Sequence, residues 1–176
     1  MNSKKMNPFK MIVLIVLASI IGFGYGYFSL MLFPNNVENA ILNVIVLNVF
    51  HFFIGYLLQL VVHEVGHFLF GRLTGYSFVS LRVGYFMLFK YEGRLQFTLV
   101  NKPGLSGQCL MSPPEYNNGK FPYILYNSGG VLLNLIASAA ALLMVSEQFP
   151  LFVNMFLVGF GLSGIYTAII NGMPVK

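Results

Sequence analysis

Long runs of apolar residues without charge dominate the pattern of this chain. Four runs stand out, and Glu64 is the only charged residue within them: residues 11–33, 40–71, 121–146 and 151–171. Each run reaches or exceeds the roughly 20 residues that a helix needs to cross the hydrocarbon core of a bilayer. Because lipid offers no hydrogen-bond partners, backbone at that depth must satisfy its own hydrogen bonds, which favours helices. The pattern therefore predicts an all-α membrane protein with about four transmembrane helices.

The segment between the second and third runs, residues 74–120, has a different pattern. Aromatic and β-branched residues prevail up to Val100, and Glu92-Gly93 separates two such stretches, which predicts a β-hairpin. Residues 101–120 are rich in proline and glycine, which is typical of irregular chain. We expect a single membrane-embedded domain, 1–176, with a cytoplasmic, membrane-associated β-hairpin insert between its second and third helices.

Composition and charge support a membrane protein and exclude a nucleic-acid-binding protein. Hydrophobic residues make up 57% of the 176 residues and charged residues 9%, whereas soluble domains carry about 25% charged residues. The basic residues that give the net charge of +5 lie before the first run, between the second and third, and at the last position. By the positive-inside rule, both termini and the insert are cytoplasmic. We expect a multi-pass protein in the lipid bilayer of a prokaryotic cell membrane.

Two further observations concern the first apolar run and the single cysteine. The apolar part of residues 11–33 exceeds the 7–15 residues of a signal peptide, so we expect a retained span. Cys109 is the only cysteine, which excludes an intrachain disulfide, and it receives no role.

The second run carries a stripe of small and polar residues at helical spacing. Its members follow one another at steps of three or four residues and so share one helix face: Asn48, His51, Gly55, Gln59, His63 and His67. Polar groups in a bilayer face protein or water. Hydrogen bonds between helices are a sufficient reason for Asn48, His51 and Gln59. They explain less well why His63, Glu64 and His67 occur together.

Two histidines four residues apart on a helix can bind one zinc ion, at about 2 Å from each ring nitrogen. Zinc lowers the pKa of a bound water to about 7, and Glu64, beside the first ligand, can take a proton from it. The alternative is a polar cluster without metal, although an acid within a span costs about 2.5–3.5 kcal/mol on insertion scales. The motif therefore predicts a zinc site with His63 and His67 as ligands and Glu64 as the base.

Three motifs in this order resemble the site-2 protease family of intramembrane zinc metalloproteases: HEVGH at 63–67, SGGVLLN at 128–134 and NGMP at 171–174. The resemblance implies a membrane-embedded protein or peptide substrate, with Asn134 and Asn171 supporting the substrate or transition state. It also implies a membrane-associated sheet to whose edge a substrate strand could add. The family's third zinc ligand is an aspartate beyond the proline. This chain has no aspartate, so we expect a C-terminally truncated fragment of a longer protease.

Three functions remain open. The first is an intramembrane zinc metalloendopeptidase that uses a glutamate base. The alternative is a non-catalytic membrane protein of the same fold that binds or regulates a partner, because the third ligand is absent. A metal transporter is less favoured, since a transporter has no need of a glutamate beside the first ligand.

Overall fold

The computed structural model describes residues 37–101, 106–115 and 122–173, together with the single positions 12, 16, 22, 24 and 27. Three helices and four strands lie in these ranges. The helices are α2 (Val37–Leu73), α3 (Tyr123–Leu143) and α4 (Leu151–Gly172). The strands are β1 (Ser77–Val83), β2 (Phe86–Tyr91), β3 (Arg94–Leu99) and β4 (Gly107–Ser112).

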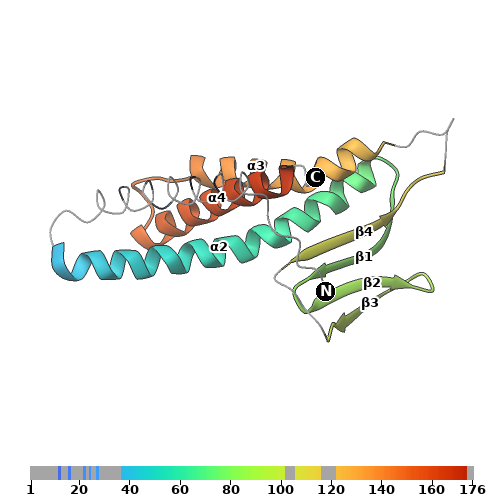
Figure 1. The fold of residues 1–176 in the computed structure, drawn as a ribbon, viewed down its shortest axis with the longest axis horizontal. Coiled ribbons are helices and arrows are strands. Elements are labelled where there is room, and N and C mark those ends of the chain that lie inside the picture. Colours follow the sequence, from blue (N-terminus) through green and yellow to red (C-terminus); the bar gives the residue numbers. More distant parts are fainter. Residues whose placement is uncertain are drawn as a thin grey trace.

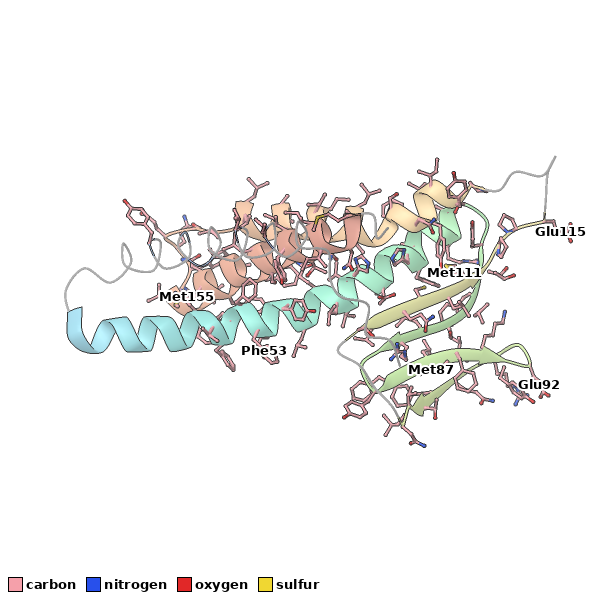
Figure 2. The ribbon with its side chains drawn as sticks, viewed as in Figure 1. Phe53, Met87, Glu92, Met111, Glu115 and Met155 are labelled. Atoms are coloured by element: carbon pink, nitrogen blue, oxygen red, sulfur yellow. The ribbon has the colours of Figure 1, made fainter. Side chains whose placement is uncertain are left out.

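The three helices lie side by side, with α3 running antiparallel to α2 and α4 (Figure 1). All three contain a segment long and apolar enough to cross a membrane: Asn48–Leu73, Tyr123–Leu143 and Leu151–Gly172. Phe53 is half exposed and points away from the other two helices (Figure 2), as expected of a side chain that faces lipid.

The expected fold, an all-α protein with four spans and a β-hairpin, is wrong. Within the described ranges three helices could span a membrane, and a four-stranded antiparallel sheet is present beside them. The expected first span, 11–33, lies outside these ranges except for five single positions. The expected spans 40–71, 121–146 and 151–171 correspond to α2, α3 and α4.

The sheet has the strand order β3-β2-β1-β4, and all its pairs are antiparallel. The predicted turn joins β2 to β3: Tyr91 pairs with Arg94 around Glu92 (φ 48°) and Gly93 (φ 80°). Positive φ at both turn residues is the geometry that suits the twist of a two-residue hairpin. Strand β4 lies in the segment expected to be irregular, because its pairing with β1 decides its conformation.

The end of α2 directs the sheet back along the helix. Gly75 has φ 87°, the amide of Tyr76 donates to the Gly71 carbonyl (2.9 Å) and that of Gly75 to the Arg72 carbonyl (3.2 Å). This is a Schellman motif, which ends a helix with a left-handed residue. The chain reverses there, so β1 and its partner β4 pack beside the C-terminal part of α2 (Figure 1).

One buried cluster joins the sheet to the helices. Tyr76, Cys109 and Met111 are buried together, with Phe68 of α2 and Tyr126 of α3 packed against them. Figure 2 places Met111 where β4 approaches the end of α2, and Glu92 at the far tip of the hairpin.

Small residues bring α2 and α3 into backbone contact. A Cβ at Gly66 would collide with the backbone of Gly129, and one at Gly130 with the ring of His63. Such close approach is typical of helices that pack in membranes.

Candidate metal centre

The polar stripe of α2 faces the interior of the helix bundle. Asn48, His51, Gln59 and His63 are buried, and His67 is partly buried. Gln59 Nε2 donates to the Phe160 carbonyl of α4 (3.1 Å), and the His51 ring packs edge-on against Phe152 of α4 (4.6 Å between centroids). His51 is about 18 Å from His63 along α2. Gln59 therefore joins α2 to α4 through a hydrogen bond, and the ring of His51 packs against α4.

The rings of His63 and His67 converge. Their Nε2 atoms are 3.2 Å apart, with the ring planes at 85° to each other. Zinc binds imidazole nitrogen at about 2.0–2.1 Å in tetrahedral geometry, which separates two donor nitrogens by about 3.3–3.4 Å. The pair therefore fits two of the ligand positions around one zinc ion.

The outer nitrogens of both rings also have partners. His67 Nδ1 lies 2.8 Å from the backbone carbonyl of Tyr126 in α3. A carbonyl only accepts, so this nitrogen carries the hydrogen and Nε2 has the lone pair that a metal requires. His63 Nδ1 lies 3.4 Å from Asn134 Nδ2, also in α3. The Gly130 carbonyl faces the same ring.

Glu64 is 5% exposed and faces β4. Its carboxylate accepts a hydrogen bond from the backbone N–H of Cys109, and Arg82 of β1 is a nearby positive charge. Gly107 packs so closely that an added Cβ would overlap the carboxylate. The turn at Gly75 thus brings a sheet strand against the expected base.

His63, Glu64 and His67 line one cavity of about 390 Å³. Residues from all three helices and from the start of β4 line it: Tyr56, Leu60, His63, Glu64, His67, Ser106, Gly107, Gln108, Cys109, Tyr126, Asn127, Thr167, Ile170 and Asn171. Asn171 is one of these lining residues, and its role toward a substrate stays a prediction. Asn134 has no exposed surface and is absent from the lining.

The third ligand remains the missing part of the donor set. Within the described residues, no three His, Cys, Asp or Glu side chains form a group that could hold a metal ion. Glu64 lines the same cavity as the histidines but does not complete such a group. The side chains present therefore fit a metal as a pair of donors with a carboxylate beside them.

Sequence reasoning missed Tyr126 and the first residues of β4. Tyr126 accepts from His67 through its carbonyl, and its hydroxyl donates to the Cys109 carbonyl over 2.8 Å. One signal was available: Tyr126 precedes Gly130, Asn134 and Ser138 at steps of four on the same helix face.

Both backbone polar groups of Cys109 are taken by helix side chains, Glu64 at the N–H and Tyr126 at the carbonyl. The edge of β4 is therefore closed at this residue, while β3 is the opposite edge of the sheet. Substrate addition to a sheet edge stays a prediction, and this contact limits where on β4 it can occur. Cys109 is 8% exposed as a residue, and burial of its thiol, assisted by the charge of Glu64, raises the pKa of the thiol to about 12.

The comparisons with known proteins add no family to this picture. No protein-family model, curated protein or solved structure matches the chain.

Proposed function

We propose that this chain carries the core of an intramembrane zinc metalloendopeptidase. The observation that supports the proposal best is the convergence of His63 Nε2 and His67 Nε2, 3.2 Å apart, with Glu64 on the same cavity. Three histidines occur in the chain, and only these two line that cavity. Their separation also comes close to the distance of about 3.3–3.4 Å between two nitrogen ligands of one tetrahedral zinc ion.

The residues divide the chemistry between them. Zinc held by the two Nε2 atoms would supply a Lewis acid and a water whose pKa is near 7. Glu64 would hold the proton lost by the attacking water at one carboxylate oxygen and pass it to the amine of the leaving peptide. The Cys109 N–H fixes the orientation of the carboxylate by holding an oxygen. Asn171 lies on the cavity wall, where its amide can hydrogen-bond a bound peptide.

The depth of the site favours a substrate within the membrane. His67 and His63 precede the end of the apolar segment at Leu73 by six and ten residues, which is about 9 and 15 Å of helix. The proposed substrate is accordingly a membrane-embedded protein or peptide. In the proposed topology both termini and the sheet are cytoplasmic, as the distribution of basic residues favours.

The proposal is tested by separating metal binding from hydrolysis. Zinc binding to the full chain in nanodiscs should fall at least tenfold in His63→Gln and His67→Gln, and it should persist in Glu64→Gln. Release of a fluorophore from a membrane-embedded polypeptide should be lost in all three variants. His51→Gln is the matched control, because His51 lies on the same stripe but away from the cavity, and it should change neither property.

Two results would contradict the proposal. One is zinc affinity that does not depend on the two histidines. The other is cleavage that continues unchanged in Glu64→Gln.

A second candidate is a non-catalytic membrane protein that binds or regulates a partner. The observation that favours it is the donor pair without a third His, Cys, Asp or Glu in the described ranges. It predicts zinc binding through both histidines with no hydrolysis by the wild-type chain.

A further inference from the structure

Asn134 has a position that does not suit contact with a substrate. Its side chain has no exposed surface, and it is absent from the lining of the cavity. Its amide instead faces the outer edge of His63, with Nδ2 3.4 Å from His63 Nδ1. Its Oδ1 is buried and has no hydrogen-bond partner among the described residues.

The two histidines and their partners form a directional chain of hydrogen bonds. Because Tyr126 offers a carbonyl, His67 Nδ1 donates to it and His67 Nε2 is an acceptor. His63 Nε2, 3.2 Å away, then donates to His67, which leaves a lone pair on His63 Nδ1. Asn134 Nδ2 donates to that lone pair. In this orientation of the amide, His63 has no lone pair for a metal.

Rotation of the Asn134 amide that exchanges Oδ1 and Nδ2 changes the tautomer of His63. Oδ1 then takes the place of Nδ2 and accepts from a hydrogen on His63 Nδ1, which frees the Nε2 lone pair. The same rotation gives the orphaned Oδ1 a partner. Leaving a buried acceptor without one costs about 1–3 kcal/mol.

We propose that Asn134 is a positioning residue that selects the metal-binding tautomer of His63 by rotation of its amide, rather than a residue that touches substrate. The metal in this inference rests on the proposed function, whereas the contact between Asn134 and His63 does not. The Gly130 carbonyl also faces the His63 ring. As a backbone group it is kept in every variant below, so differences between variants report on Asn134.

Zinc titration of the full chain in nanodiscs tests the proposal with three variants. Asn134→Leu removes the acceptor and should weaken zinc binding about 10–100-fold, as loss of such a partner usually does. Asn134→Asp keeps an acceptor at Nδ1 and should bind zinc at least as tightly as Asn134. Ser138→Ala is the matched control, because Ser138 is equally buried one turn along α3 but contacts Gln59, and it should change nothing.

The tautomer of His63 can be measured directly, and a purely structural role of Asn134 would not change it. With three histidines in the chain, ¹⁵N-histidine labelling gives few signals, and a His63→Gln sample assigns those of His63. Before zinc is added, the hydrogen should be on Nε2 in the wild type and on Nδ1 in Asn134→Asp. After zinc is added, the wild type should carry it on Nδ1.

Two outcomes would overturn the role of Asn134. One is equal loss of zinc affinity in Asn134→Leu and Asn134→Asp, which is what a packing role predicts. The other is a His63 tautomer that is the same in wild type and Asn134→Asp before zinc. Absence of zinc binding in the wild type would contradict the proposed function, and the tautomer comparison would still decide the role of Asn134.

Discussion

The backbone carbonyl of Tyr126 accepts the Nδ1–H of His67 over 2.8 Å, and so fixes which nitrogen of that ring faces the cavity. The hydroxyl of the same residue donates to the Cys109 carbonyl. Tyr126 therefore connects α3 to the histidine pair through its main chain and to the sheet through its side chain.

These two contacts can be separated in Tyr126→Phe. The variant loses the hydroxyl bond to Cys109 and should lower the free energy of unfolding by about 0.5–1.5 kcal/mol. It keeps the carbonyl, so zinc affinity should be unchanged. Thermal unfolding in detergent and zinc titration measure the two properties. A large loss of zinc affinity with unchanged stability would show that the division between main chain and side chain is wrong.

Gly130→Ala should damage the histidine pair directly. The added methyl would occupy the space of the His63 ring, so the ring must move away from its partner. Overpacking of this kind costs about 1–3 kcal/mol of stability, and we expect at least tenfold weaker zinc binding. Gly172→Ala is the control, because its Cβ would meet Val131 at an ordinary 3.8 Å. Equal zinc binding in both variants would contradict the predicted contact.

Gly107→Ala tests whether β4 positions the base. Its methyl would overlap the Glu64 carboxylate and should displace it, while both histidines keep their places. Hydrolysis should then fall at least tenfold with little change in zinc affinity. Ser106→Ala changes a neighbouring residue of the same cavity wall and should retain hydrolysis. If the two variants behave alike, the contact between β4 and Glu64 does not matter to the reaction.

The buried thiol of Cys109 predicts slow alkylation. Its pKa is raised from about 9 to about 12, so at about pH 8 the thiolate fraction is about a thousandfold smaller than in the unfolded chain. Reaction with iodoacetamide, followed by mass spectrometry, should be slow until denaturant is added. Cys109 is the only cysteine, so the signal is unambiguous.

The same pKa gives a pH dependence with a defined sign. Between about pH 9 and pH 12 the unfolded chain releases the thiol proton while the folded chain retains it. Stability should therefore fall as pH rises through this window, by up to about 1.4 kcal/mol per pH unit. A Cys109→Ala variant should lack this component. The alkylation prediction has its own contrary outcome: rapid reaction of the folded chain at about pH 8 would show that the thiol is accessible.

The sequence predicted the parts of the structure that depend on local pattern. The three helices follow from apolar runs, and the convergence of His63 and His67 follows from a spacing of one helical turn. The Glu92-Gly93 hairpin follows from the backbone preference of its turn. Each of these depends on a few neighbouring residues.

The rest depends on contacts between distant segments. Strand β4 could not be predicted because its conformation comes from pairing with β1 across a segment of proline and glycine. The contact between Tyr126 and His67 uses a backbone carbonyl, which every residue type possesses. The identity of Asn134 indicates what it can donate and accept, but only the packing of α3 on α2 decides that it faces His63.

The Schellman turn at Gly75 decides which residues of β4 lie beside Glu64. Glu64 lies eleven residues before Gly75, about three turns of helix, and β1 runs back from this turn to the point where its partner β4 meets Glu64. One residue inserted into α2 between these points would rotate Glu64 by about 100° relative to β4. An insertion at the Glu92-Gly93 tip would leave that alignment untouched. Because the end of α2 sets this alignment, we expect an insertion at the Glu92-Gly93 turn to be tolerated far better than one in α2 between Glu64 and Gly75.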